Sequence, residues 1–94
     1  MSQKISVIIP VYYGDVAQFI EEAFMSILNQ TISPDEIVIS IDGKLNNNLE
    51  EKIIKLKKFE GVNIIRSKKN NGLGIARHKG IVASKNEIIA IMDS

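Results

Sequence analysis

A short apolar run near the start of the chain, residues 5–11 (ISVIIPV), restricts the fold more than any other feature. Most of its positions are apolar and many are β-branched, which is typical of a strand buried on both faces in the centre of a parallel sheet. Pro10 has no backbone N–H to donate, so we expect regular strand pairing to stop there. The loop after it would leave the carboxyl end of a central strand, where open α/β sheets bind their ligands.

Three more short apolar runs alternate with helical patterns along the rest of the chain. Strands are predicted over residues 36–41, 62–66 and 87–92, and helices over residues 16–29, 49–56 and 73–84. Parallel crossovers are right-handed, so this alternation predicts a Rossmann-like, three-layer α/β/α fold. Its parallel four-stranded sheet is expected in the order 3-2-1-4.

Local signals refine the predicted helices. Asp15 is expected to cap the first helix, and the asparagine run at residues 46–48 is expected as a turn and possible cap of the second. Gly61 is expected to end the second helix as a glycine just past its terminus. Small residues in the third helix, Gly80 among them, would let it lie close on the sheet. The predicted inward face of the first helix consists of Val16, Phe19, Ile20, Ala23 and Ile27.

The composition fits one ordered domain over residues 1–94. The chain is 45% hydrophobic and 24% charged, and its lack of cysteine fits a reducing compartment such as the cytoplasm. The net charge of +1 is uneven, because residues 1–51 carry two basic and eight acidic side chains, and residues 52–94 carry ten and three. The basic half is either a solvated helix face or a surface for a phosphorylated ligand or an anionic membrane. Nucleic acid is not expected as a partner, because the few aromatic residues do not alternate with the lysines.

A parallel sheet would gather the residues that follow its strands at one edge. Tyr12 follows the first strand, Asp42 the second, the loop at residues 71–74 the third and Asp93 the fourth. The ring of Tyr12 could stack on a nucleobase. The carboxylate of Asp42 only accepts hydrogen bonds, so it would select a base with a ring N–H: uracil, thymine or guanine. In Asp-Gly it could equally be a turn residue.

Two further residues suit a phosphorylated ligand. Asp93 could hold a divalent metal ion together with substrate phosphates, although an acid after a strand is also common as a helix cap. Arg77 could contact diphosphate oxygens or pair with a carboxylate, either Asp93 or Asp42. A Gly-x-Gly-x-x-Gly sequence after the first strand and a Walker A sequence are both absent.

Five segments, in this order, resemble family-two glycosyltransferases of the GT-A fold. They are residues 6–12 (SVIIPVY), 26–31 (SILNQT), 36–43 (EIVISIDG), 71–77 (NGLGIAR) and 88–94 (IIAIMDS). The resemblance implies the N-terminal, nucleotide-binding half of a GT-A fold. It also implies inverting transfer of a sugar from a nucleotide-diphospho-sugar, with UDP expected, to a carbohydrate or lipid-linked acceptor. Cell-surface polysaccharide synthesis in the cytoplasm, or at the inner face of the membrane, is the expected setting.

The same resemblance assigns roles to single residues. Pro10 and Tyr12 would border the base, Asp42 would bond to it, and Gly72 and Arg77 would belong to a donor-binding loop. Asp93 would open an Asp-x-Asp motif that binds Mg²⁺ or Mn²⁺. The second acid of that motif and the catalytic base would lie beyond residue 94, so we expect a donor-binding fragment of a longer transferase with little or no turnover.

Two other functions fit parts of the pattern. A nucleotidyltransferase could use a similar sheet, although it would normally have a glycine-rich, basic loop after the first strand. A non-catalytic binding or assembly module is favoured by Ile41 and Lys44, which stand where the family often has an acid and a serine. The edge of a truncated sheet is also a candidate surface for self-association.

Overall fold

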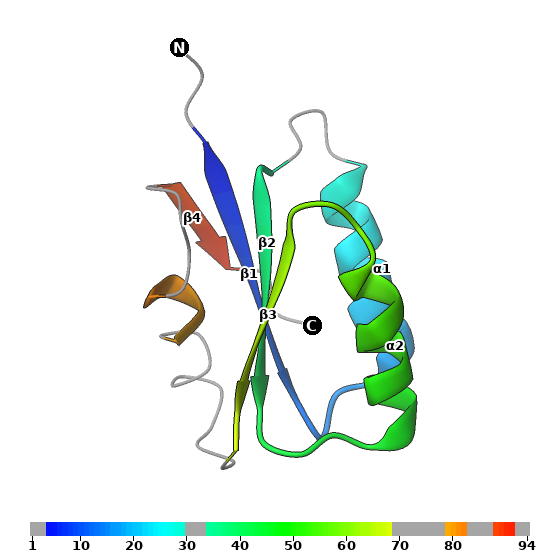
Figure 1. The fold of residues 1–94 in the computed structure, drawn as a ribbon. Helices are drawn as coiled ribbons and strands as arrows, with labels where there is room; N and C mark the ends of the chain where they lie inside the picture. The colour runs from blue at the N-terminus through cyan, green and yellow to red at the C-terminus, as the bar shows by residue number, and fades with distance from the viewer. Residues whose placement is uncertain (1–3, 30–33, 69–78, 83–87, 92–94) are drawn as a thin grey trace.

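The computed structural model describes residues 4–29, 34–68, 79–82 and 88–91 of the chain. Its labelled elements, in chain order, are β1 (Ile5–Tyr12), α1 (Ala17–Leu28), β2 (Glu36–Asp42), α2 (Asn47–Lys57), β3 (Val62–Ser67) and β4 (Ile88–Ile91). The strands pair in parallel, in the order β3-β2-β1-β4 (Figure 1). The predicted α/β fold with a parallel sheet is therefore confirmed.

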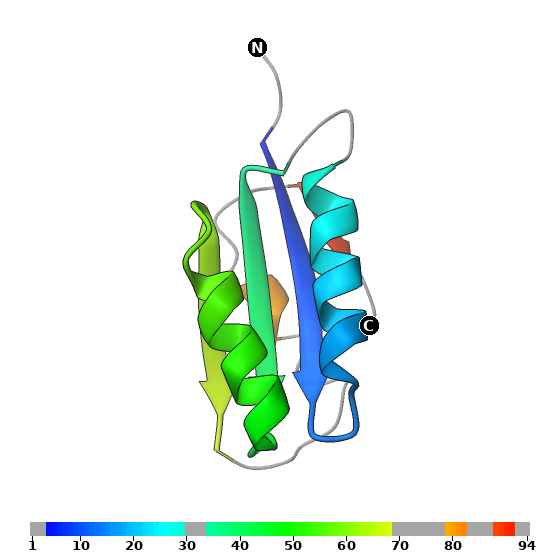
Figure 2. The ribbon, with the colours of Figure 1, turned by 90° about the vertical axis from the view of Figure 1, so that its right-hand side faces the viewer.

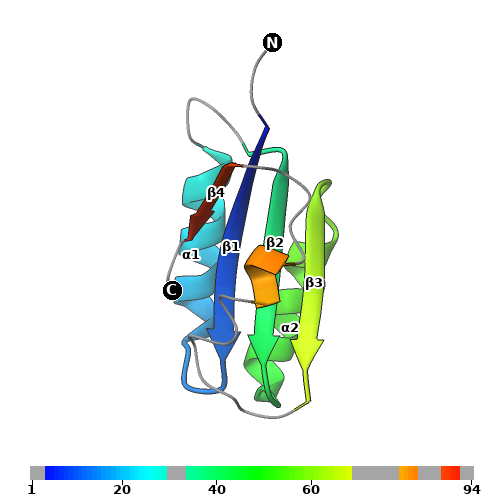
Figure 3. The ribbon, with the colours of Figure 1, turned by 90° about the vertical axis from the view of Figure 1, so that its left-hand side faces the viewer.

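Helical segments cover both faces of the sheet. Helices α1 and α2 lie side by side on one face, with their axes along the strands (Figure 2). A helical turn at residues 79–82 lies on the opposite face (Figure 3). Gly80 makes this close approach feasible, because a Cβ there would collide with Cγ2 of Ile8 and come within 3.5 Å of Cβ of Ser40.

The main core lies between the sheet and the two long helices. Alternate residues of the central strands point into it, because successive side chains in a strand face opposite sides. Leucine, isoleucine and phenylalanine side chains from the helices complete it. The buried members from the elements are Val7, Ile9, Val11, Ile20, Phe24, Ile27, Ile37, Ile39, Ile41, Leu49, Ile53 and Leu56.

Pro10 does not end strand pairing, contrary to our expectation. Strand β1 continues to Tyr12, and Pro10 lies opposite Ser40 in the register with β2. Each residue of a strand directs its N–H toward only one side, so a proline removes one ladder bond and leaves the other neighbour's pairing intact. The described part of β4 pairs with β1 from Ile5 to Ile8.

The first helix differs from its prediction at its start. Its N-cap residue is Val16, which makes no side-chain capping bond, and Asp15 bonds instead to the backbone of Tyr12. Val16 and Phe19, predicted to face inward, are 52% and 56% exposed, and Phe24 is buried in their place. The buried face of the helix instead follows Ile20, Phe24 and Ile27, which recur four and three residues apart, and Val16 and Phe19 lie outside it.

Of the predictions for the two ends of α2, the one for its start is confirmed and the one for its end is wrong. The asparagine run supplies the expected N-cap, since Asn46 Oδ1 accepts a hydrogen bond of 2.9 Å from the backbone N–H of Leu49. The helix ends at Lys57 with Lys58 as its C-cap, so Gly61 does not terminate it. Gly61 instead has φ of 82° immediately before β3, and its carbonyl accepts from the N–H of Ile37 in β2.

Some predicted segments extend beyond the described residues. Of the predicted third helix, residues 79–82 are described and are helical, and of the predicted fourth strand, residues 88–91 are described. In the described ranges, none of the helices is both long enough and apolar enough to cross a bilayer.

Candidate functional site at the carboxyl edge of the sheet

Three of the strands end side by side at one edge of the sheet. Tyr12 of β1 lies opposite Asp42 of β2, and Asp42 lies opposite Ser67 of β3. Each is the last residue of its strand. Parallel pairing without a register offset therefore aligns a phenol, a carboxylate and a hydroxyl along the edge where open α/β sheets bind ligands.

These side chains share one face of the sheet as well as one edge. Val11 and Ile41, one residue earlier in their strands, point into the core beneath α1 and α2. Strand alternation therefore directs Tyr12 and Asp42 to the opposite face, the face that carries the helical turn at residues 79–82. Pro10 is buried on the same side, two residues before Tyr12.

Asp42 is buried within this edge. Only 1% of the residue is exposed, and it makes contacts within the chain. The following residue, Gly43, has φ of 78° and donates its backbone N–H to the carbonyl of Ser67 at 3.0 Å. This left-handed conformation favours glycine, so Asp42-Gly43 is a strand end fixed both by its backbone and by the neighbouring strand.

The loop after β1 holds Tyr12 in a tight turn. Oδ2 of Asp15 accepts from the backbone N–H of Tyr12 at 3.0 Å, and the N–H of Asp15 donates to the carbonyl of Tyr12 at 3.1 Å. The phenol ring of Tyr12 lies over Gly14, because a Cβ on Gly14 would come within 2.6 Å of the ring. Tyr13 packs edge-on against that ring, with centroids 5.7 Å apart, and is itself exposed.

A lysine reaches this edge from the helical turn. Nζ of Lys79 donates to Oγ of Ser67 at 2.8 Å. Ser67 is a site residue that the sequence did not single out, because a serine at the end of a predicted strand carries no distinctive pattern. The signal that locates it is register, which appears only when β3 is paired with β2.

The remaining predicted site residues are outside the described part of the chain. Pro10, Tyr12 and Asp42 are described and lie together at the carboxyl edge. Gly72, Arg77 and Asp93 fall in ranges that the structure does not describe, so their roles stay predictions. The described residues contain no group of three or more His, Cys, Asp or Glu side chains that could hold a metal ion.

A shallow hollow lies just outside the tips of β2 and β3. It measures about 280 Å³ and is lined by Gly43, Lys44, Glu50, Arg66, Ser67 and Lys68. Arg66 is held there by a bidentate ion pair with Glu50, with N–O distances of 2.9 and 3.0 Å. The basic side chains give this hollow a positive lining next to the candidate site.

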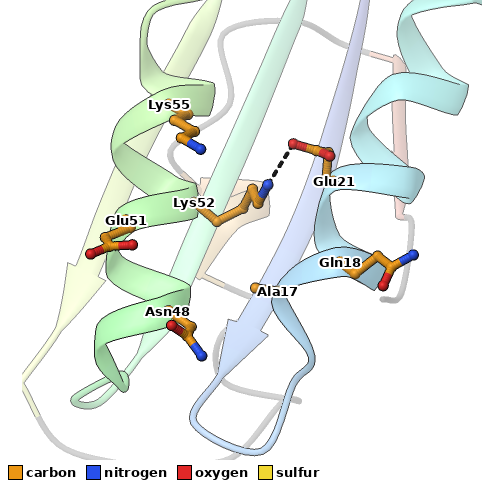
Figure 4. A pocket seen from close by; sticks show the side chains of 7 residues that line it. All are labelled: Ala17, Gln18, Glu21, Asn48, Glu51, Lys52 and Lys55. Carbon is orange, nitrogen blue, oxygen red and sulfur yellow. Dashed lines mark hydrogen bonds and ion pairs between the residues drawn. The ribbon is translucent and has the colours of Figure 1, made fainter.

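A second hollow, of about 270 Å³, lies between α1 and α2, on the opposite side of the sheet from Tyr12 and Asp42 (Figure 4). Nζ of Lys52 in α2 donates to Oε2 of Glu21 in α1 at 2.6 Å. That hydrogen bond, together with the positive charge of Lys52, lowers the pKa of the Glu21 carboxyl below its ordinary value. The pair joins the two helices and does not take part in the site at the strand tips.

A sequence model described as Glycosyl transferase family 2 matches residues 6–94 of the chain. This chain belongs to glycosyl transferase family 2. The resemblance seen in five separate segments is thus confirmed over almost the whole sequence. The relatives found by comparison are named as glycosyltransferases.

Named relatives of this family 2 chain are bacterial glycosyltransferases. A UDP-Gal:alpha-D-GlcNAc-diphosphoundecaprenol beta-1,3-galactosyltransferase of Escherichia coli is 32% identical over 91 residues, which are 97% of this chain and 33% of that protein. The poly(ribitol-phosphate) beta-N-acetylglucosaminyltransferase TarP of Staphylococcus aureus is 35% identical over 95 residues, 98% of this chain and 28% of that protein. The family 2 chain therefore spans about a third or less of the length of these relatives.

A solved structure supports the fold of this family 2 chain. The crystal structure of S. aureus TarS superposes with a TM-score of 0.78 at 22% sequence identity, covering 96% of this chain and 16% of that one. At this identity the likeness concerns the fold alone. It agrees with the parallel α/β architecture described above.

Proposed function

We propose that this chain binds the nucleotide of a nucleotide-diphospho-sugar donor, with UDP as its nucleotide, for an inverting glycosyltransferase. The observation that carries the proposal is the register of β1 and β2, which sets Tyr12 directly opposite Asp42 on one face and at one edge. The first-named relative supports the choice of UDP, because its name specifies a UDP-linked sugar. Membership of glycosyl transferase family 2 supports the reaction class.

The chemistry of the two side chains explains the choice of base. The aromatic ring of Tyr12 offers a stacking surface, and stacking a base on an aromatic side chain is worth about 1–3 kcal/mol. The carboxylate of Asp42 accepts hydrogen bonds and cannot donate them, so it pairs with the N3–H of uracil and repels the unprotonated N3 of cytosine. A base that stacks on Tyr12 and bonds to Asp42 therefore satisfies both residues at once.

We also propose that Asp93 contributes to a Mg²⁺ or Mn²⁺ site at the donor diphosphate. A site of this kind needs only one or two carboxylates, because phosphate oxygens supply further ligands. When bound, the ion would neutralise charge on the diphosphate. In the sequence Asp93 comes two residues after β4, and β4 pairs with β1, the strand that ends at Tyr12.

The acceptor is proposed to be a carbohydrate or a lipid-linked sugar, modified in the cytoplasm at the inner face of the membrane. The name of the Escherichia coli relative specifies a diphosphoundecaprenol-linked acceptor, and another relative is an amylovoran biosynthesis glycosyltransferase of Erwinia amylovora. These names support a role in cell-surface polysaccharide synthesis. Because the chain matches about a third of the first relative's length, we propose that it binds donor without transferring sugar by itself.

Titration of the chain with uridine, cytidine and UDP, followed by amide chemical shifts, tests this function. We expect uridine to bind and cytidine to bind weakly. Tyr12→Ala should weaken uridine binding roughly tenfold or more, since stacking is lost, whereas the neighbouring control Tyr13→Ala should have a smaller effect. Asp42→Asn should lower the preference for uridine over cytidine, because an amide can donate to N3 of cytosine.

The metal is tested by comparing two ligands. Mn²⁺ should strengthen the binding of UDP and leave that of uridine unchanged, because only UDP carries a diphosphate. Asp93→Asn should remove the Mn²⁺ effect on UDP without changing uridine binding. If the wild-type chain binds neither uridine nor UDP, the donor-binding function is wrong, and a non-catalytic assembly module becomes the better interpretation.

A further inference from the structure

The contact between Lys79 and Ser67 places a cation beside the carboxylate of the candidate site. Ser67 lies directly opposite Asp42 in the pairing of β3 with β2, and neighbouring strands lie about 4.8 Å apart. Nζ of Lys79 is 2.8 Å from Oγ of Ser67. The ammonium group is therefore bonded to the last residue of the strand next to Asp42, at the same edge of the sheet.

The side chains of Asp42 and Ser67 also face the same side of the sheet. Arg66, the residue before Ser67, bonds to Glu50 of α2, so strand alternation directs Ser67 to the face without the two long helices. Asp42 faces that side for the same reason, since Ile41 is in the core beneath α1 and α2. The backbone that carries Lys79 is fixed there by Gly80, which fits against Ile8 and Ser40.

We propose that Lys79, positioned by Ser67, binds the donor base at the ring carbonyl next to the N–H that Asp42 accepts. This inference rests on the proposed binding of uracil at Tyr12 and Asp42. In uracil, N3–H is flanked by the carbonyls at C2 and C4, so an acceptor on the protein facing N3–H leaves a carbonyl on each side of it. An ammonium group carries three N–H donors and no acceptor, and Ser67 takes one of the three.

The two side chains together are complementary to a base of this kind. A carboxylate flanked by a donor is complementary to a ring N–H flanked by a carbonyl. Cytosine has an acceptor in place of the N–H, so it would turn a lone pair and not a donor toward the carboxylate. Lys79 thus contacts a second group on the base edge, next to the N–H that Asp42 contacts, and it does so from a different element of the fold.

The experiment compares uridine with 2-thiouridine and 4-thiouridine on the wild-type chain. Each analogue keeps N3–H and replaces one carbonyl oxygen with sulfur, a much weaker acceptor. The nucleosides carry no phosphate, so removing a lysine cannot act through attraction to phosphate. We expect the wild type to bind uridine roughly tenfold more tightly than one of the two analogues, as is typical when a charge-assisted hydrogen bond is lost.

Variants then test whether Lys79 causes this difference in affinity between uridine and the analogue. Lys79→Met should reduce the uridine-to-thiouridine ratio to about one, because the donor to the carbonyl is gone, whereas Lys79→Arg should keep part of it. The control Lys57→Met removes an exposed lysine at the end of α2 and should leave the ratio unchanged. Ser67→Ala keeps the lysine but removes its anchor, so it should lower the ratio partly, and it serves if Lys79→Met does not fold.

The outcomes separate this inference from the function on which it rests. If uridine binds but the wild type does not distinguish it from either analogue, the role of Lys79 is wrong and donor binding stands. The same conclusion follows if the ratio persists in both Lys79→Met and Ser67→Ala. If the wild type binds UDP but none of the nucleosides, the role of Lys79 at the base is wrong and donor binding stands. If it binds neither the nucleosides nor UDP, both the donor-binding function and the role of Lys79 are wrong.

Discussion

Gly80 is a single residue on which the arrangement of one whole face depends. A Cβ at this position would overlap Cγ2 of Ile8 and lie 3.5 Å from Cβ of Ser40. Both partners belong to the central strands, and the overlapping atom lies on a β-branched side chain with few alternative rotamers. The helical turn therefore approaches the sheet as closely as it does because residue 80 has no side chain.

Gly80→Ala should lower the free energy of unfolding by about 1–3 kcal/mol, since the added methyl group overpacks a filled interface. The gain in helix propensity from alanine works in the opposite direction and is smaller than the clash. Urea unfolding of the variant and of the wild type measures the difference.

A double mutant distinguishes this clash from a general effect of the substitution. Ile8→Ala removes the atom with which the new methyl group would overlap, so Gly80→Ala should cost less in that background than in the wild type. Equal costs in the two backgrounds, or a stabilised Gly80→Ala variant, would contradict the close packing of the turn on β1.

At the scale of elements, α1 and α2 are parallel neighbours whose first turns are built differently. Helix α2 starts with a side-chain cap, because Asn46 accepts from the N–H of Leu49, whereas the N-cap of α1, Val16, makes no such bond. Between the helices, Lys52 donates to Glu21 across an open, solvated hollow. The start of α2 thus depends on a local bond, and the start of α1 on the turn that Asp15 makes with Tyr12.

Asn46→Ala should reduce stability by about 1 kcal/mol, the usual cost of losing a side-chain N-cap. Asn48→Ala is the matched control: it changes an exposed asparagine of the same run, two positions later, and should have little effect. Asn46→Asp retains the accepting oxygen and should retain most of the stability. Thermal unfolding followed by circular dichroism ranks these variants, and equal losses for Asn46→Ala and Asn48→Ala would show that the cap contributes nothing.

At the scale of the whole molecule, the face opposite α1 and α2 carries a polar cluster at each end of its strands. At the amino end, Oε1 of Glu36 accepts from Oγ of Ser6 at 2.8 Å and Oε2 accepts from Nδ2 of Asn63 at 2.6 Å. This buried carboxylate joins β1, β2 and β3 by side-chain bonds. The carboxyl end of the same strands holds the candidate site.

Glu36→Ala should cost about 1–3 kcal/mol of unfolding free energy, because the buried hydroxyl of Ser6 and the amide of Asn63 lose the carboxylate that accepts from them. Glu36→Gln keeps the size and one acceptor oxygen, so its loss should be smaller. The control Glu51→Ala removes an exposed acid from α2 and should change stability little. The midpoints of urea unfolding rank the stability of these variants, provided that m, the dependence of the unfolding free energy on urea concentration, is unchanged. A Glu36→Ala variant as stable as Glu51→Ala would mean that the three-strand bridge does not stabilise the sheet.

The sequence by itself determined the alternation of strands and helices, the parallel sheet and the family. Runs of β-branched residues and helical periodicity are local signals, so they can be recognised without knowledge of the tertiary contacts. The same signals placed Tyr12 and Asp42 at strand ends, because a parallel sheet aligns those ends whatever its side chains are. Where the local signal was ambiguous, as for the first turn of α1 and for Pro10, the prediction was wrong.

Only the tertiary structure decided which residues meet at the carboxyl edge. Register between β2 and β3 brings Ser67 opposite Asp42, and the packing of Gly80 on Ile8 brings Lys79 to Ser67. These contacts join positions far apart in the chain, and their geometry depends on strand spacing and on which face each side chain occupies. Neither of these contacts can be recognised as a local pattern in a single sequence, because strand pairing and helix packing depend on all the elements together.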